Sequence, residues 1–566
     1  MSDYLLTTPY EEKMDKNIPH GYYPRPSLRR DSYLCLNGEW DFEINDSSYK
    51  AEYKEKILVP FPPESKLSGI ERIVGENEYM HYKKSFTLPE GFNKGRVILH
   101  FGAVDTVCEV RLGDTVLGRH EGGYLPFSFD ITKALSGGEN TLYVDVKDGI
   151  DKRYPYGKQT YKRGGMWYTP VSGIWQTVWL ESVPENYIEA LKITPDISSV
   201  LIEVKGGENK KRITLKDSGE TFEFEGESIR IYPKTVKNWT PETPYLYEFT
   251  IECGSDTVES YFALRRVEIC DTGSKKAVLL NGKSYLFNAL LDQGYYPDGI
   301  FMPATVDGYK DDIIMAKSLG FNTLRKHIKI EPEIFYYLCD KEGVAVFQDM
   351  VNNSDYSFFR DTVLPTVGLQ KLKDARLHTD PVSRKQFLYD MLETADHLYN
   401  FPSVLYYTIF NEGWGQFDAD AAYDLLKFAE PTRIIDSTSG WFRRHKSDVD
   451  SRHIYFKKLK LKKPSGDPVC ISEFGGYSHR VDGHVFGKDN YGYRLFATQK
   501  EFEDAFVALY ENEVAPLIKE GAFAFVYTQV SDVEDETNGL ITYDRRVLKV
   551  DPARVKAVMD KIFVNN

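Results

Sequence analysis

The first 184 residues consist of short apolar and β-branched runs that are separated by glycine-containing turns. In RVILHFGAVDTVCEVRLGDTVLGRHEGG (96–123), the runs are broken at Gly-Asp and Gly-Gly, and no helical period of useful length is present. Short runs of this kind between turn residues are typical of β-strands. The pattern predicts a jelly-roll-like β-sandwich over residues 1–184, with SGIWQTVWLESV (172–183) as its last strand.

A second β-rich stretch follows, of about the size of an immunoglobulin domain. RITLKDSGETFEFEGESIRIYP alternates between apolar and polar residues and turns at Asp-Ser-Gly and Glu-Gly. NWTPETPYLYEFTIEC then enters a strand after a proline-edged segment. We expect a small immunoglobulin-like sandwich over residues 185–271.

After residue 271, strand-like runs alternate with helical patterns. PEIFYYLCDKEG has Pro332 at its first helical position and Gly343 just past its end. SRKQFLYDMLETADHLYN begins with Ser383 and Gln386 at capping-box spacing, and TQKEFEDAFVALYENEV repeats that spacing with Thr498 and Glu501. Strands that alternate with helices indicate a parallel sheet.

The length of this region fits an eight-stranded (β/α) TIM barrel over residues 272–566. KKLKLKKPSGD (457–467) is too basic and too broken for a full helix. We therefore expect one outer helix of the barrel to be missing there.

Composition and charge argue against several kinds of partner. The net charge is −14, which disfavours nucleic acid and anionic membranes as the main partner. No 18-residue apolar run is present, and MSDYLLTTPYEEKMDKN has no apolar stretch of signal-peptide length. The six cysteines show no CxxC or Cys/His spacing, so neither a disulfide framework nor a structural metal is expected. We expect a cytoplasmic protein without metal or cofactor.

Two glutamates each lie at the end of a short apolar strand in the barrel region. VLYYTIF (404–410) leads directly to Asn411 and Glu412, and DPVCISEFGG (467–476) carries Glu473. Because barrel chemistry lies at the carboxyl ends of the strands, we expect both glutamates to face one cavity. Glycoside hydrolysis needs such a pair, about 5–5.5 Å apart in retaining enzymes and roughly 6.5–9.5 Å apart in inverting ones. The alternative is that each glutamate is an exposed loop acid.

Segments along nearly the whole chain resemble family 2 of the glycoside hydrolases, the β-galactosidase and β-glucuronidase family. The amino-terminal sugar-binding sandwich of that family is resembled by YPRPSLRRDSYLCLNGEWDFEI, GGYLPFSFDIT and SGIWQTVWLE. Its immunoglobulin-like middle is resembled by NWTPETPYLY and FALRRVEI. Its catalytic barrel is resembled by LLNGKSYLFNALLDQGYYPDG, GFNTLRKH, FNEGWGQF, ISEFGG and YTQVSDVEDETNGLITYDRR.

The resemblance implies a retaining exo-β-glycosidase. Glu412 matches the acid/base of the family, and Glu473 matches the nucleophile. Asn411 matches the residue that holds the sugar 2-hydroxyl, and Arg325 in NTLRKH matches a basic residue beneath the nucleophile. An arginine beside a carboxylate lowers its pKa, which suits a nucleophile.

Two further strand ends supply candidate ligands. HIYF contains His453, a candidate substrate ligand, and Tyr455, which matches a tyrosine that hydrogen-bonds the nucleophile or is a core tyrosine. His327, two residues after Arg325, is either a substrate ligand or a satisfied core histidine, because better-known members have histidine three residues after the arginine.

Aromatic residues near strand ends are candidates for stacking on a sugar ring. Trp414 and Trp441 follow strand ends and either stack on substrate or pack in a lid. Tyr527 in FVYTQ lies where many family members have a tryptophan platform at the eighth strand, so we expect it to form the floor of the subsite.

The glycone is not determined by these motifs. Asp292 in LLDQGYYPDG, a candidate substrate ligand, stands where β-galactosidases have Asn-Arg-His, which puts a galactoside in doubt. The Asn-x-Lys carboxylate reader of β-glucuronidases is missing between residues 474 and 566, although a lysine from elsewhere could replace it. Lys158 and Gln159 in YPYGKQTYKRGG are candidates to reach the barrel mouth from the first domain.

The expected partner is a small carbohydrate or glycoside, and the resemblance also allows a homo-oligomer. Two alternatives to hydrolysis remain open at this stage. One is a carbohydrate-binding protein that has lost turnover. The other is a transglycosylase, in which a second sugar replaces water.

Overall fold

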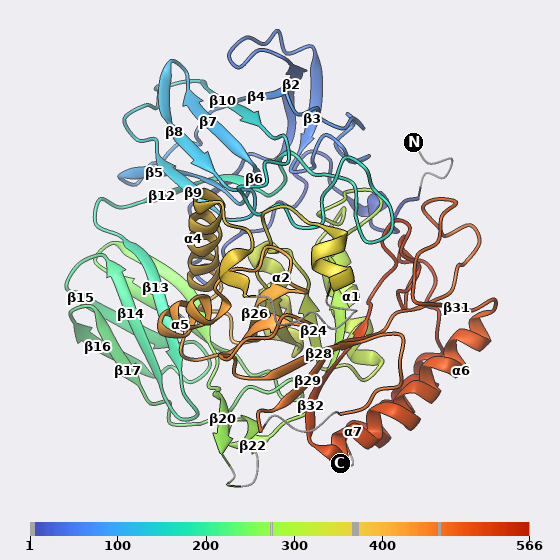
Figure 1. Ribbon diagram of the computed structural model, residues 1–566. Coiled ribbons are helices and arrows are strands. Elements are labelled where there is room, and N and C mark those ends of the chain that lie inside the picture. The colour runs from blue at the N-terminus through green and yellow to red at the C-terminus, as the bar shows by residue number, and fades with distance from the viewer. Residues whose placement is uncertain (1–5, 272, 274–275, 365–372, 462–465, 565–566) are drawn as a thin grey trace.

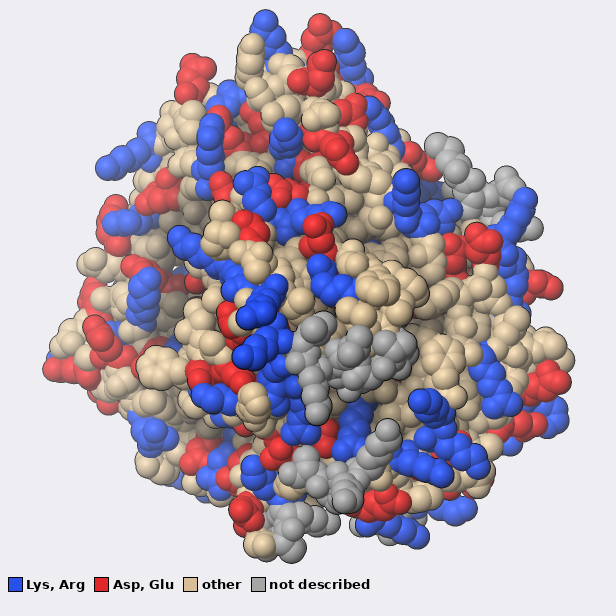
Figure 2. Space-filling view, in the orientation of Figure 1, with Lys and Arg blue, Asp and Glu red and all other residues tan. Residues whose placement is uncertain are grey.

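The chain folds into two β-sandwiches and one parallel barrel that pack against one another (Figure 1). The computed structural model describes residues 6–271, 273, 276–364, 373–461 and 466–564. Among those residues, no helix is long and apolar enough to span a membrane. Acidic and basic side chains are interspersed on the face shown in Figure 2.

The first sandwich pairs a six-stranded antiparallel sheet with a four-stranded one. Alternate residues are buried along β10, as expected for a strand with one face on a core. The larger sheet has the order β3 (Glu55–Val59), β2 (Gly38–Asn45), β4 (Tyr79–Phe86), β10 (Asn140–Lys147), β7 (Val107–Leu112) and β8 (Thr115–Glu121). The smaller sheet has the order β1 (Tyr33–Cys35), β12 (Val178–Val183), β5 (Arg96–Phe101) and β9 (Phe127–Asp130), and a separate ribbon joins β6 (Val104–Asp105) to β11 (Gly173–Ile174).

A smaller β-sandwich with its own apolar core follows. One sheet contains β13 (Ile188–Pro195), β14 (Val200–Gly206) and β17 (Ser228–Ile231). The other contains β16 (Thr221–Glu225), β15 (Lys210–Leu215), β18 (Tyr247–Cys253) and β19 (Asp256–Phe262). Short ribbons elsewhere are formed by β20 (Val267–Asp271), β21 (Lys276–Leu280) and β22 (Lys283–Ser284), and by β30 (Tyr477–Ser478) and β31 (Arg494–Leu495).

The third part is a sheet of eight parallel strands, which confirms the predicted barrel. β27 and β28, at the two ends of the hydrogen-bonded order, lie next to each other. The strands in chain order are β23 (Phe287–Asp292), β24 (Thr323–Lys326), β25 (Ala345–Asp349), β26 (Val404–Asn411), β27 (Ile434–Ser439), β28 (Asp450–Ile454), β29 (Val469–Gly475) and β32 (Ala522–Thr528).

Helices cover the outside of the barrel and bury a large apolar cluster between themselves and the strands (Figure 1). The α-helices are α1 (Asp307–Ser318), α2 (Glu333–Glu342), α4 (Pro381–His397), α5 (Ala419–Ala429), α6 (Gln499–Leu509), α7 (Ala515–Glu520) and α8 (Pro552–Met559). Short 3-10 or π segments are η1 (Glu11–Lys13), η2 (Phe358–Val363), η3 (Asp374–Arg376), η4 (Tyr510–Val514) and η5 (Asp560–Val564).

The helix ends test the capping predictions. The capping box of Thr498 and Glu501 at the start of α6 is confirmed. The box predicted at Ser383 is wrong, because α4 begins earlier and its cap is Asp380, whose side chain accepts a hydrogen bond from the Ser383 N–H. Pro381, at the first position of α4, favours a start at this point.

More helices are missing from the barrel than expected. α5 lies between β26 and β27, but the described residues contain no helix between β27 and β28. The predicted gap, between β28 and β29, also contains no helix among residues 455–461 and 466–468; residues 462–465 of that stretch lie outside the described part. Glu412 and Glu473 are 61 positions apart, and the chain between them consists mainly of strands and loops, with α5 as its one helix among the described residues.

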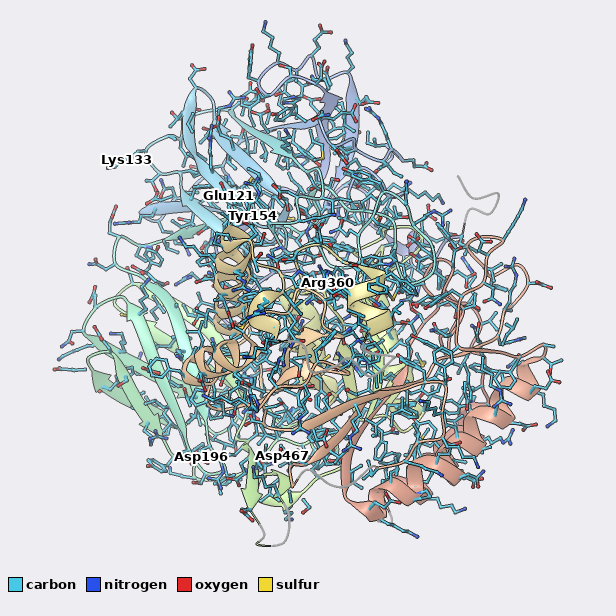
Figure 3. All side chains as sticks on the ribbon, viewed as in Figure 1. Glu121, Lys133, Tyr154, Asp196, Arg360 and Asp467 are labelled. Carbon is cyan, nitrogen blue, oxygen red and sulfur yellow. The ribbon has the colours of Figure 1, made fainter. Side chains whose placement is uncertain are left out.

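The first sandwich is fixed on the barrel by an aromatic core. Trp175 of the sandwich is buried, its ring lies 5.0 Å from that of Phe301 in the barrel, and its Nε1–H donates to the Gly123 carbonyl. The long connection between β10 and β11 crosses this junction, where the Tyr154 hydroxyl donates to Glu121 at 2.5 Å (Figure 3). Farther along this connection, Lys158 lies in a cavity with the two candidate glutamates.

All six cysteines are unpaired. The cytoplasmic location expected from their spacing stays a prediction, as does a homo-oligomer.

Candidate active site

Glu412 lies at the carboxyl end of the fourth barrel strand and is held there by a left-handed backbone. β26 is buried along its whole length up to Asn411. Glu412 has a φ of 52°, and its N–H donates to the Ser439 carbonyl on β27 at 2.9 Å. Gly413 follows with a φ of 78°, and a Cβ there would come within 2.3 Å of the Phe442 ring. Such a backbone costs about 1–3 kcal/mol at a non-glycine residue, so the surrounding turn must hold Glu412 in place.

Glu473 lies near the carboxyl end of the seventh strand, which is also fully buried. Gly475 and Gly476 follow with φ values of 82° and 62°. A Cβ at Gly476 would come within 2.3 Å of the Tyr493 ring, which stacks on Tyr455 with the ring centroids 3.7 Å apart. The second glycine therefore makes room for the aromatic pair beside Glu473.

The two glutamates line the same cavity, with His453 between them. Nδ1 of His453 lies 2.7 Å from Glu412 Oε1 and 3.4 Å from Glu473 Oε2, and one carboxylate oxygen of each glutamate lies within 4.8 Å of the other. Nε2 of His453 lies 2.6 Å from Ser439 Oγ. Because ionised carboxylates only accept hydrogen bonds, Nδ1, which faces both of them, can carry the proton that they accept.

A buried arginine holds Glu473 from behind. Arg325 is 1% exposed, and its NH1 group donates to Glu473 Oε1 at 3.0 Å. Its Nε donates to Asp349 Oδ1 at 3.0 Å, and the Tyr455 hydroxyl donates to Glu473 Oε2 at 2.5 Å. Burial by itself raises the pKa of Glu473, but His453 and Arg325 together lower it below its ordinary range. The carboxylate is therefore ionised at neutral pH, as a nucleophile requires.

Asn411 and His327 also line this cavity. The Asn411 side-chain oxygen accepts from Arg325 NH2 at 2.9 Å, and within the described residues its NH₂ group has no acceptor. Nδ1 of His327 lies 2.6 Å from Asp349 Oδ2. Burial and the nearby Lys158 ammonium lower the pKa of His327 to about 4, so its ring is neutral at pH 7.

Two predicted ligands lie outside the cavity, because strand side chains alternate between the two faces of a barrel. Asp292 accepts from the Lys326 ammonium at 2.7 Å, whereas its neighbours Leu291 and Gln293 line the cavity. Tyr527 is fully buried in the outer apolar cluster, with its ring 4.9 Å from that of Phe506 on α6. Both predictions are corrected: Asp292 is part of a buried ion pair, and Tyr527 is a core residue.

The two tryptophans lie at the edge of the site. Trp414 is 5% exposed, lines the cavity, and packs edge-on against Trp167 with the ring centroids 4.9 Å apart. Trp441 donates its indole N–H to the Asp361 carbonyl at 3.0 Å, and its ring lies 5.7 Å from that of His453. Trp441 therefore borders the histidine that joins the two glutamates.

Several cavity residues come from loops that carry no periodic signal. Lys158 lines the cavity, whereas Gln159 donates to Asp105 at 3.0 Å inside the first sandwich and so does not reach the barrel. Other lining residues that the sequence reasoning did not single out are Met166, Trp167, Leu291, Ile328, Tyr356, Tyr493, Thr528 and Glu536. Of these, Leu291, Thr528 and Glu536 lie in segments that carry the family resemblance.

Glu412, His453 and Glu473 are also the groups that could hold a cation. Their donor atoms lie within 4.8 Å of one another. A proton on Nδ1 of His453, shared with the two carboxylates, accounts for the same arrangement without an ion.

Two family models match the chain. One, described as a glycosyl hydrolase 2 galactose-binding domain-like region, matches residues 59–170, and the other, the glycosyl hydrolases family 2 TIM barrel domain, matches residues 274–548.

Relatives with curated names are distant. A putative β-glucuronidase of Formosa agariphila is 25% identical over 432 residues, which are 70% of this chain and 50% of that protein. A β-galactosidase of Vibrio vulnificus is 25% identical over 485 residues, which are 73% of this chain and 43% of that protein. The chain thus spans about half the length of the curated relatives it matches.

Solved structures share the fold along almost the whole chain. A β-glucuronidase of Faecalibacterium prausnitzii is 20% identical with a TM-score of 0.73, and covers 96% of this chain and 99% of its own. A family 2 β-galacturonidase of Eisenbergiella tayi bound to galacturonate is 18% identical with a TM-score of 0.70, and covers 94% and 98%.

Proposed function

Because the chain belongs to family 2 of the glycoside hydrolases, we propose that it is a retaining exo-β-glycosidase with Glu473 as nucleophile and Glu412 as acid/base. The observation that carries the proposal is the pair of carboxylates with His453 between them, within 4.8 Å of each other in one cavity. This proximity of one oxygen of each carboxylate supports the retaining arrangement, in which the two carboxyl groups are about 5–5.5 Å apart, over the wider inverting one.

In the first step, the Glu473 carboxylate attacks the anomeric carbon of the terminal sugar. Glu412 gives its proton to the glycosidic oxygen, the bond between that oxygen and the anomeric carbon breaks, and the aglycone leaves as an alcohol. The product is a glycosyl ester on Glu473. Arg325 and Tyr455, both hydrogen-bonded to Glu473, hold the carboxylate in position for this attack.

In the second step, water replaces the aglycone. Glu412, now ionised, takes a proton from the water as the oxygen attacks the anomeric carbon, and the ester bond to Glu473 breaks. The free sugar leaves with its original β-configuration. While the ester exists, Glu473 carries no negative charge and so does not repel the Glu412 carboxylate.

The remaining cavity residues are assigned to substrate binding. The NH₂ group of Asn411, which has no acceptor among the described residues, can donate to the sugar 2-hydroxyl, as the family resemblance implies. The His327 ring, neutral and fixed by Asp349, offers Nε2 as an acceptor. Trp414 and Trp167 supply aromatic surface at the rim.

We also assign residues 1–184 to a sugar-binding-like sandwich, 185–271 to an immunoglobulin-like sandwich and 272–566 to the catalytic barrel. These boundaries are supported by the separate apolar cores of the two sandwiches and by the separate sheet of the barrel.

The proposal is tested by release of nitrophenol from a panel of aryl β-glycosides: galactoside, glucoside, mannoside, arabinoside, glucuronide and galacturonide. We expect turnover of at least one of them, and its loss in Glu473→Gln, which keeps the shape of the side chain without its charge. Silence across the panel, together with binding of a sugar that raises the melting temperature, would instead support a non-catalytic carbohydrate-binding protein.

A further inference from the structure

A third carboxylate faces the candidate active site. Glu536, in the loop that follows β32, is 4% exposed and lines the cavity with Glu412 and Glu473. Its Oε2 accepts from the Tyr168 hydroxyl at 2.5 Å and from Gln529 Nε2 at 3.0 Å. Within the described part of the chain, Oε1 accepts no hydrogen bond.

A lysine from the first domain faces the same cavity. The Lys158 side chain is half-buried, and in the described residues its ammonium makes no hydrogen bond or ion pair. The ammonium lies 5.7 Å from the centroid of the Tyr168 ring, whose hydroxyl donates to Glu536. Lys158 and Glu536 therefore belong to one wall of the cavity.

The backbone on both sides of Lys158 is fixed. The N–H groups of Tyr156 and Gly157 both donate to the Asn352 carbonyl of the barrel, at 3.1 and 3.4 Å. The Lys158 carbonyl accepts from the Tyr168 N–H at 3.0 Å. An anchored lysine in a cavity whose three donor hydrogens have no protein acceptor is arranged for a ligand.

We propose that Lys158 and Glu536 together recognise hydroxyl groups of a neutral glycone, and that the site selects such sugars over uronic acids. This inference rests on the proposed glycosidase function. A sugar hydroxyl can donate to Glu536 Oε1 and accept from the Lys158 ammonium, because it has one donor hydrogen and two acceptor lone pairs. The pair thus matches a hydroxyl on both of its hydrogen-bonding sides.

A uronate carboxylate matches this wall poorly. It offers only acceptors, so it could satisfy Lys158 but would leave Glu536 Oε1 facing another anion. The cavity already contains Glu412 and Glu473. Burial raises the pKa of Glu536 above its ordinary value and the Lys158 ammonium partly offsets that rise, so the lysine charge already acts on a carboxylate of the protein.

The test compares sugars that differ only at C6. Values of kcat/KM are measured for aryl β-galactoside against β-galacturonide, and for β-glucoside against β-glucuronide, in the wild type and in Glu536→Gln, Lys158→Met and the double variant. Lys152→Met is the control, because Lys152 lies in the same connection but is exposed and paired with Asp355 at 2.5 Å.

We expect the neutral member of a pair to be preferred by the wild type. Each single variant should lower kcat/KM for the neutral sugar by about 10- to 100-fold, as for a lost hydrogen bond to a charged group. The reduction of kcat/KM in the double variant should be smaller than the product of the two single-variant reductions, because both groups contact shared hydroxyls. Lys152→Met should behave as the wild type.

Two results would overturn the inference. One is a wild type that prefers the uronides and loses that preference in Lys158→Met, which would make Lys158 a carboxylate reader. The other is a change below about twofold in both single variants, within the range of neutral surface substitutions. If no glycoside is turned over, the proposed function fails, and the role of Lys158 and Glu536 is tested separately by binding. The affinities of free galactose and galacturonic acid for the wild type and for Lys158→Met are then measured by calorimetry. Equal affinities of the wild type for galactose and galacturonic acid would reject the inference.

Discussion

Nδ1 of His453 lies 2.7 Å from Glu412 Oε1, and the same nitrogen lies 3.4 Å from Glu473 Oε2. The imidazole is fully buried and is oriented by Ser439 on its other nitrogen. A single N–H group thus interacts with both proposed catalytic carboxylates. His453 is therefore better explained as a positioning residue for the pair than as a sugar ligand.

Replacing His453 by leucine should impair the chemistry more than substrate binding. We expect kcat to fall at least about tenfold, the effect of losing a hydrogen bond to a charged group, with a smaller change in KM. Because His453 helps to lower the pKa of Glu473, the acid limb of the pH profile of kcat/KM should move to higher pH. Ser439→Ala, which leaves Nδ1 in place, should give a smaller shift, and an unchanged acid limb in His453→Leu would contradict this role.

Glu412→Gln should separate the two chemical steps. With a dinitrophenyl glycoside, whose leaving group needs no proton, the first step should proceed while the second is slowed for want of a base. Stopped-flow measurements should then show a burst of about one phenolate per enzyme, and mass spectrometry should find the sugar on the peptide that contains Glu473. Glu473→Gln should show neither burst nor adduct. A product of inverted configuration, determined by NMR, would reject the retaining mechanism.

Two tyrosines near the ends of the sixth and eighth barrel strands should respond differently to loss of the hydroxyl. Tyr455→Phe removes the 2.5 Å hydrogen bond to Glu473 and should lower kcat about 10- to 100-fold. Tyr527→Phe alters a ring that packs against Phe506 outside the cavity, so kcat and KM should change by no more than about twofold. Steady-state kinetics of the two variants would refute the corrected assignment if Tyr527→Phe had the larger effect on KM.

Several barrel strands were predictable because they are short apolar runs that end in polar residues. The segments VLYYTIF, DPVCISEFGG and FVYTQ overlap β26, β29 and β32, whereas HIYF shares only His453 and Ile454 with β28, which begins at Asp450 and is mostly polar. Helix ends were less predictable. Asp380 and Ser383 are both good cap residues, and only the start of α4 at Pro381 decides between them.

Which face of a strand a side chain occupies was the main source of error in the candidate site. Asp292 and Tyr527 lie at the expected strand ends but point away from the cavity, and a shift of one residue reverses the face. Lys158 and Glu536 come from irregular loops, whose course depends on contacts such as those of Tyr156 with Asn352. Periodicity carries no information about such contacts, and the family resemblance indicated only the segment that contains Glu536.

The stability of the protein should report the ionisation of Glu473 directly. Its pKa is lowered from 4.5 to about 2 in the folded chain, since His453 and Arg325 outweigh the effect of burial. Between these two values the unfolded chain binds more protons than the folded one, so the contribution of Glu473 to stability is present above pH 4.5 and is lost as the pH falls toward 2. Glu473→Gln cannot titrate. The free energy of unfolding of the wild type minus that of Glu473→Gln, from urea titrations followed by tryptophan fluorescence, should therefore decrease as the pH is lowered from 6 to about 3.

Asp390 on α4 supplies a control of the opposite sign. Burial raises the pKa of Asp390 from 3.8 to about 7, so in that interval the folded chain binds more protons than the unfolded one. The contribution of Asp390 to stability is consequently lost as the pH rises. The free energy of unfolding of the wild type minus that of Asp390→Asn should therefore decrease from pH 4 to pH 7. Opposite slopes for the two variants would attribute each effect to its own carboxyl group. A difference for Glu473→Gln that stays constant over the acid range would mean that His453 and Arg325 do not stabilise the ionised carboxylate.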